Sequence, residues 1–189
     1  MDRNHIEDII LKLNTISRMA VIENAPDTER MLVAFTRVLK YRYQTENQMV
    51  IAEKELRLAE KMCDYYNVKS ENMIEFIQQD SRRGLGSVLI PHFSLLSFYY
   101  CMFNILSSHG KKYYIRVQTD VEGTDTGCGI SIVYTGNVDF KSVYPEIYEY
   151  ASDEYVSIKR AVAVWQQTFG TGCVQINAQE DALKICLEV

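Results

Sequence analysis

The sequence has few residues of the kinds that break helices, bind metals or form disulfides. Its 189 residues include three prolines, three histidines and five cysteines, and the first glycine is at position 84. The cysteines are odd in number and far apart, at Cys63, Cys101, Cys128, Cys173 and Cys186. That spacing fits neither a disulfide framework nor a zinc site, so we expect reduced thiols and no bound metal.

Excess charge and long apolar runs are also lacking. The chain has 20 Lys and Arg against 25 Asp and Glu, a net charge of −5, and no basic segment that would bind nucleic-acid phosphates. No apolar run approaches the roughly 18 residues that cross a membrane. Charged residues follow Met1 directly, with no secretory signal pattern. We therefore expect a cytoplasmic protein that binds neither nucleic acid nor membranes.

Apolar residues make up 47% of the chain, enough for a sizeable core. In the first helix the apolar positions recur at steps of three and four, at Ile6, Ile9, Ile10, Leu13, Ile16 and Met19. Pro26 interrupts this stripe, and similar spacing predicts a second helix up to Tyr43 and a third over 50–68. Two helices with such broad stripes need further helices to cover them.

Beyond residue 70 the hydrophobic period changes. The pattern predicts strands at 73–77, 113–117, 130–132, 173–177 and 183–189, helices at 90–108 and 153–169, and a loop over 145–152. The fold class is therefore α+β. We predict a helical hairpin with a linking helix over 1–68 and a mixed α/β domain over 69–189.

Motifs for catalysis are not found. The sequence has no nucleophile elbow, no Walker loop and no dinucleotide-binding glycine motif. None of the histidines is spaced for a metal pair, and the thirteen tyrosines are scattered through every predicted element. These observations favour binding over catalysis.

Four stretches in order resemble one family. Residues 13–20, Leu-Asn-Thr-Ile-Ser-Arg-Met-Ala, look like part of a phosphoacceptor helix. Residues 53–76 are similar to an acidic helix and the strand after it, Ile90-Pro91 to the entry of a nucleotide-site helix, and 155–170 to a glycine-box helix. Together they resemble the kinase core of autolysin-sensor-type histidine kinases, over essentially the whole chain. The resemblance implies a dimerising hairpin that forms a four-helix bundle and an α/β sandwich of the Bergerat ATPase type.

The phosphoacceptor is the first departure from the family pattern. Counting back from Asn14, Glu7 occupies the position of the histidine. A carboxylate cannot form the stable phosphoramidate that phosphotransfer requires. His5 is a weak alternative acceptor, because two residues correspond to about 200° around a helix.

The nucleotide site is the second departure. Tyr134 stands where the family has the aspartate that binds the adenine amino group, and Gly136 is kept but Val138 replaces the second glycine. Tyr155 and Ser157 stand where a glycine box should expose amides to phosphate. We therefore predict that no nucleotide is bound.

The Mg²⁺-binding asparagine is ambiguous. Asn104 matches it under one alignment, whereas Cys101 or Ile105 matches under others. The resulting hypothesis is a catalytically inactive, histidine-kinase-like regulator that acts as a homodimer and pairs with a true histidine kinase or a response regulator. One alternative is an enzyme that uses ATP and Mg²⁺ at a divergent site built on Asn104 and His109. Another is a sensor of a different small ligand in the reshaped pocket.

Overall fold

The computed structural model describes residues 3–44, 49–70, 73–78, 88–109, 112–124, 127–153 and 156–189. The helices are α1 (Arg3–Ile22), α2 (Pro26–Gln44), α3 (Ala52–Ser70), α5 (Ser94–Ser108), α6 (Phe140–Glu149) and α7 (Ile158–Phe169). The strands are β1 (Met49–Ile51), β2 (Met73–Gln78), β3 (Leu89–Pro91), β4 (Tyr114–Thr124), β5 (Gly127–Gly136), β6 (Ala151–Asp153), β7 (Val156–Ser157), β8 (Val174–Ala178) and β9 (Ala182–Glu188).

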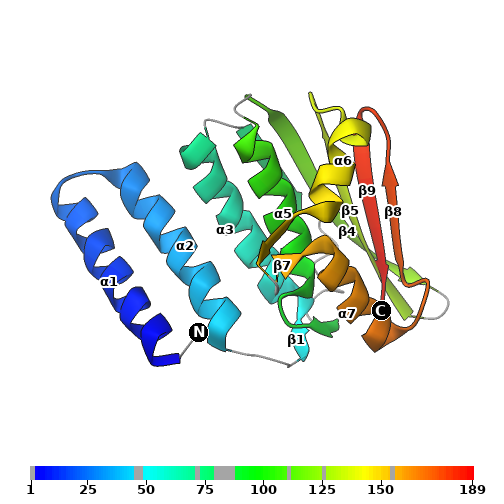
Figure 1. The fold of residues 1–189 in the computed structure, drawn as a ribbon, viewed down its shortest axis with the longest axis horizontal. Coiled ribbons are helices and arrows are strands. Elements are labelled where there is room, and N and C mark those ends of the chain that lie inside the picture. Colours follow the sequence, from blue (N-terminus) through cyan, green and yellow to red (C-terminus); the bar gives the residue numbers. More distant parts are fainter. Residues whose placement is uncertain are drawn as a thin grey trace.

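These elements lie in layers (Figure 1). The α1–α2 hairpin is outermost, α2 packs against α3, and α3 and α5 separate the hairpin from the sheet. Helices α6 and α7 cover the rest of the same sheet face. The chain is thus α+β, a helical hairpin followed by a mixed sheet with helices, which confirms the predicted fold class.

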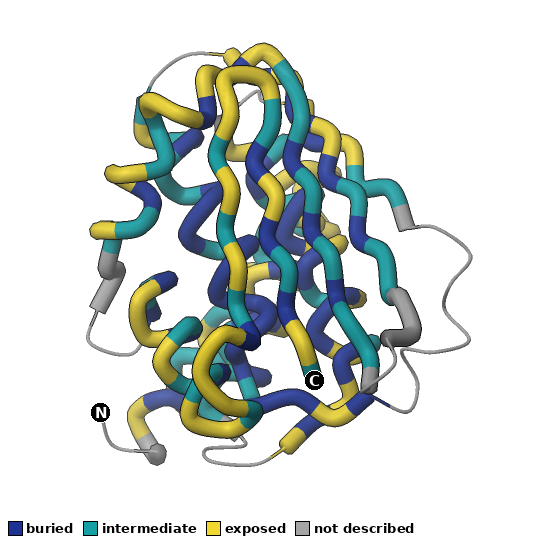
Figure 2. Tube along the Cα trace, turned by 90° about the vertical axis from the view of Figure 1, so that its right-hand side faces the viewer, coloured by how far each residue is buried: buried dark blue, intermediate teal, exposed yellow. Residues whose placement is uncertain are grey.

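The main sheet has the strand order β2-β4-β5-β9-β8. Strand β2 runs parallel to β4, and every other neighbouring pair is antiparallel. Buried and more exposed residues alternate along the strands because one face is covered by helices and the other is open, as seen face-on in Figure 2. The core is formed by side chains of these helices and of the covered sheet face. Its largest fully buried members include Trp165, Tyr99, Tyr134, Phe98, Phe103 and Phe140.

Most predicted elements of the α/β part are present. One predicted loop and the predicted starts of two helices were wrong. The predicted loop over 145–152 is largely helix α6, which Asp139 caps by accepting a hydrogen bond from the Ser142 amide and which buries Phe140 and Ile147. Pro145 lies inside this helix. The two helices predicted from 90 and 153 begin later, because Leu89–Pro91 pairs with β1 and Val156–Ser157 pairs with β6.

The hairpin buries only part of the predicted stripe on its first helix. Ile6 and Ala20 of α1 are buried and Leu13 is half-buried, whereas Ile16 and Met19 are 48% and 52% exposed. Helix α1 packs against α2, and five of its apolar side chains remain exposed in the single chain: Leu11, Ile16, Met19, Val21 and Ile22. Among the described helices, none is long and apolar enough to span a membrane.

A buried carboxylate joins the hairpin to the α/β part. Glu55 of α3 is fully buried and accepts hydrogen bonds from the Tyr41 hydroxyl of α2 (2.8 Å), the Leu96 amide (2.8 Å) and the Phe93 amide. The two amides are at the N-terminus of α5, where N–H groups otherwise have no acceptor. Burial raises the pKa of Glu55 to about 7, although these amides and the Tyr41 hydroxyl act in the opposite direction.

Candidate functional site

The residues that the resemblance assigns to a nucleotide site lie on one face of the sheet and around α5. Strand β5 carries Tyr134 between Val117 of β4 and Leu183 of β9, with its side chain turned toward the helices. The ring is fully buried, and its centroid lies 6.2 Å from that of Tyr99 on α5. Tyr134 is therefore a central core residue.

The polar end of Tyr134 is unusual for a buried phenol. Its hydroxyl accepts or donates no hydrogen bond among the described residues, whereas the Tyr99 hydroxyl pairs with Thr119 Oγ1 at 2.7 Å. Burial raises the pKa of Tyr134 well above its usual value, so the phenol stays neutral. A neutral phenol in this place supplies neither charge nor a carboxylate acceptor.

The end of β5 is held tightly against β4. Gly136 pairs with Ile115, and a Cβ atom at Gly136 would lie 2.0 Å from the Tyr114 carbonyl oxygen. The Asn137 side chain accepts a hydrogen bond from the Tyr114 amide at 2.7 Å, and Val138 is buried. The glycine that the sequence shares with the family thus has a packing role in this chain.

The residues that the resemblance aligns with the second glycine box lie at the start of α7. Ser157 is the N-cap of this helix, and its hydroxyl accepts a hydrogen bond from the Arg160 amide at 3.1 Å. This hydroxyl therefore satisfies one of the amides that would otherwise point at a bound anion. The predicted site residue Tyr155 lies outside the described residues.

Asn104 and His109 do not come together with Tyr134. Asn104 lies five residues beyond Tyr99 on α5, which is about 140° around the helix. Its amide donates to the Tyr100 carbonyl oxygen at 3.1 Å, and it lines a cavity on the α2 and α3 side of α5. The structure therefore separates two residues that the resemblance places around one nucleotide.

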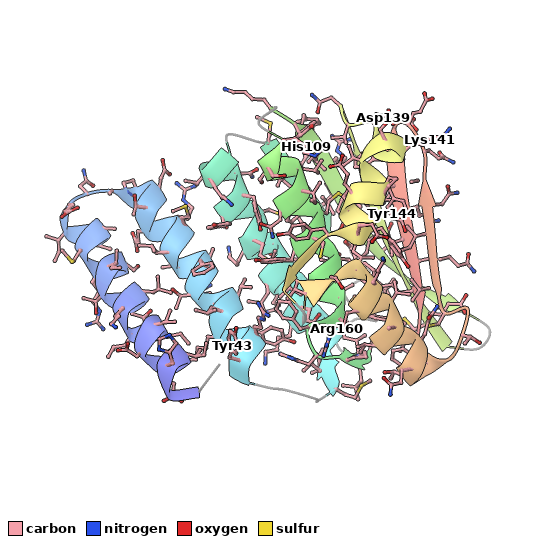
Figure 3. The ribbon with its side chains drawn as sticks, viewed as in Figure 1. Tyr43, His109, Asp139, Lys141, Tyr144 and Arg160 are labelled. Carbon is pink, nitrogen blue, oxygen red and sulfur yellow. The ribbon has the colours of Figure 1, made fainter. Side chains whose placement is uncertain are left out.

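His109 lies at the C-terminal end of α5. Its Nε2 is 2.8 Å from Glu146 Oε2 of α6 and its Nδ1 is 3.3 Å from the Tyr113 hydroxyl. Figure 3 shows His109 at the opposite end of α5 from Arg160 in the first turn of α7. His109 thus connects α5 to α6, far from the N-cap of α7.

The residues at the predicted phosphoacceptor position are accessible. Glu7 and His5 are both exposed on α1, on either side of the buried Ile6. Within the described residues, no group of three or more His, Cys, Asp or Glu is arranged to hold a metal ion. The five cysteines are free thiols, three of them buried.

The buried hydrogen bonds of Glu55 were not predicted from the sequence. Glu55 is the one charged residue on the buried side of α3, whose other members include Ala52, Leu56, Ala59 and Cys63. A lone carboxylate on an apolar stripe is the signal that could have found it, because a buried charge needs hydrogen-bonding partners. The partners themselves could not be read from the sequence, since Phe93 and Leu96 lie about 40 residues away.

The fold has relatives among solved structures. A bacterial phosphotransferase is similar with a TM-score of 0.54 and 14% identity, over 98% of this chain and 92% of that one. The catalytic domain of the histidine kinase ThkA (TM-score 0.48, 10% identity) aligns with 77% of this chain and 95% of its own. The Acinetobacter baumannii histidine kinase AdeS (TM-score 0.45, 8% identity) aligns with 100% and 85%, respectively. No family model and no curated protein matches the sequence. The likeness to the phosphotransferase shows a shared fold over nearly the whole chain.

Proposed function

We propose that this chain is a histidine-kinase-like signalling protein that binds no nucleotide and acts as a homodimer by binding other signalling proteins. The observation that carries the proposal is the burial of Tyr134 in the sheet core. The resemblance places an adenine-binding carboxylate at this position, and the chain has a neutral ring there, packed on Tyr99. The residues present therefore do not fit adenine.

The surroundings of Tyr134 support the same proposal. Helices α6 and α7 pack against each other and against α5, and they bring Phe140, Ile147, Ile158 and Trp165 into the core. The family pattern has glycines where this chain has the buried Val138 and the capping Ser157. The space and the exposed amides that a nucleotide requires are thus replaced by side chains.

The expected loss of affinity is large. Each of the three replacements, at Tyr134, at Val138 and at the glycine box, removes about 1–3 kcal/mol of binding. Because each 1.4 kcal/mol is about ten-fold in affinity, losses of about 2 kcal/mol at each of the three positions move a micromolar site beyond the millimolar range.

The corresponding experiment is calorimetry with ATP and Mg²⁺. We expect no heat of binding at millimolar nucleotide for the natural chain, and none after Tyr134→Asp, because one carboxylate does not restore the other positions. Tyr134→Phe is the matched control for folding, since it removes a hydroxyl that has no partner among the described residues. Micromolar binding by the natural chain would instead favour the ATP-using enzyme, and Asn104 and His109 variants would then locate its site.

The proposed dimer is supported by the uncovered face of the hairpin. Ile16 and Met19 lie three residues apart on one side of α1, and both side chains are about half exposed. Burying each such side chain contributes about 1.5–3 kcal/mol, which favours pairing two hairpins into a four-helix bundle. The dimer would present Glu7 and His5 at its surface without an acceptor histidine at the family position.

Ile16→Asp is expected to convert the dimer to a monomer, because it places a charge in the apolar contact. Ile16 is a better choice than Leu13, which is half-buried within the single chain. The control is Arg18→Asp, at an exposed position on another side of the same helix. Sedimentation equilibrium at tens of micromolar distinguishes the two. A natural chain that sediments as a monomer would contradict the proposal.

For partners, we propose a true histidine kinase, through a mixed hairpin bundle, or a response regulator bound without phosphorylation. Both partners interact with hairpins of this kind in the family that the sequence resembles. In either case the α/β part acts as a fixed binding surface, because Glu55 and Tyr41 hold the hairpin to it.

A further inference from the structure

A cavity lies where the hairpin meets the α/β part, on the opposite side of α5 from Tyr134. Its walls come from α2, α3, the residue before α5, and α5 itself, and its volume is about 190 Å³. Phe35 of α2 and Tyr65 of α3 form one wall, with ring centroids 6.1 Å apart and ring planes inclined by 27°. Tyr100 and Asn104 of α5 are at another wall. Among the described residues of the predicted nucleotide site, Asn104 lines this cavity, whereas Tyr134, Gly136 and Ser157 do not.

The size of the cavity limits what it holds. An apolar cavity of about 150 Å³ accommodates one benzene ring, and sites for larger organic ligands usually exceed about 300 Å³. A nucleotide is therefore larger than the volume of the cavity itself. One ring, or an apolar group of similar size, fits it.

The described residues that line the cavity carry charge of one sign. Arg42 and Lys69 are among its twelve lining residues, and none of the twelve is acidic, in a chain with five more acidic than basic residues. The Lys69 ammonium lies 5.8 Å and 5.6 Å from the ring centroids of Tyr65 and Tyr66. The Arg42 guanidinium lies 5.9 Å from that of Phe93, which also lines the cavity. The cations thus stand against the aromatic walls of the cavity.

The cavity also has polar groups that can orient a bound ligand. The Asn104 amide uses one N–H for the Tyr100 carbonyl oxygen, and its second N–H and side-chain oxygen have no hydrogen bond among the described residues. Lys69 is exposed at the rim, so an anionic group can reach it without burying the ammonium. Aromatic walls together with a cationic rim are the chemistry that recognises an organic anion with a compact apolar body.

We propose that this cavity binds a small monocyclic or similarly compact organic anion, with its apolar body between α2, α3 and α5 and its anionic group at Lys69. Such a ligand contacts both the hairpin and the α/β part. Binding therefore stabilises the packing of the hairpin on the α/β part. A small molecule can thus regulate the protein without any nucleotide. The proposal does not depend on the dimer or on the absence of ATP binding.

Benzoate is the probe, because it combines one ring with one carboxylate. Benzyl alcohol has the ring without the charge, and acetate has the charge without the ring. In titrations of the full chain followed by two-dimensional NMR, we expect saturable shifts with benzoate in the millimolar range. Binding of both other probes should be about ten-fold weaker or more. The shifted signals should come from residues that line the cavity.

The variant pair is Lys69→Met and Lys61→Met. Both replace an exposed lysine of α3 by an unbranched side chain, but Lys61 is not part of this cavity. We expect Lys69→Met to weaken benzoate binding about ten-fold and to leave benzyl alcohol unaffected, since only the charge-assisted contact is lost. Lys61→Met should bind benzoate like the natural chain.

Three results would overturn the proposal. The first is no saturable shift with benzoate. The second is equal affinity for benzoate and either partial probe, which would show that ring and charge are not recognised together. The third is equal loss of binding in the two lysine variants, which would point to a nonspecific effect of charge.

Discussion

Glu55→Ala is expected to lower the free energy of unfolding by about 3–5 kcal/mol at pH 6. The Tyr41 hydroxyl and the amides of Phe93 and Leu96 would lose their common acceptor in a buried place. Each orphaned donor costs about 1–3 kcal/mol, and the removed side chain leaves a cavity among fully buried neighbours. Urea unfolding followed by circular dichroism measures the loss. Glu60→Ala, at an exposed position of α3, is the control and should change stability by less than about 0.5 kcal/mol.

The same variant has a second signature in its pH dependence. Burial raises the pKa of Glu55 from its ordinary value of 4.5 to about 7 in the folded chain. The folded state therefore binds more protons than the unfolded state between these values, and the stability that Glu55 contributes falls as the pH rises through this window. The difference in stability between the natural chain and Glu55→Ala should accordingly be larger at pH 5 than at pH 8. A difference that is constant, or that grows with pH, would contradict the raised pKa.

Gly136→Ala is expected to lower the free energy of unfolding by about 3 kcal/mol or more. The new Cβ would lie 2.0 Å from the Tyr114 carbonyl oxygen, which is a backbone atom of the paired strand and cannot rotate away. Relief requires β4 and β5 to separate at the position where Asn137 also bonds to Tyr114. The cost is thus one of overpacking at the end of the β4–β5 ladder.

Gly172→Ala is the matched control for that variant. Gly172 also has a positive φ, of 95°, but nothing lies within 4 Å of a Cβ built there. Only the backbone conformation is penalised, which costs about 1 kcal/mol. Thermal unfolding of both variants separates the two effects. Equal losses of stability in the two variants would show that a small shift of the backbone removes the clash between the new Cβ at position 136 and the Tyr114 carbonyl oxygen.

The periodic segments were predictable because their buried residues recur at regular intervals in the sequence. The β4–β5 hairpin and the last two strands show alternation, and both pair as expected. Helix α6 escaped prediction because Pro145 and several polar residues interrupt its pattern, while two anchors, Phe140 and Ile147, sit seven residues apart. Short strands such as β1 and β3 depend on pairing with distant residues, so local sequence could not reveal them.

The candidate site was predictable only in part. Sequence position indicated that Tyr134 replaces a polar residue, and the structure adds that the ring is buried on Tyr99. Asn104 could not be assigned from sequence, because a shift of a few residues in alignment turns a different side of α5 toward the sheet. The cavity near Lys69 was hidden for another reason. It is formed by residues from 34 to 104 that approach one another only after α2 packs on α3.

The position of β2 has a consequence for how the chain assembles. The antiparallel pairs β4–β5 and β8–β9 are closed by short connections, whereas β2 pairs in parallel with β4 across about 40 residues that contain α5. Closing a short loop costs less conformational entropy and takes less time than closing a long one. The two hairpins can therefore form early and locally. Strand β2 pairs with β4 across a long connection and packs against α3, so we expect it to join the edge of the sheet after the hairpins, together with the helical layer.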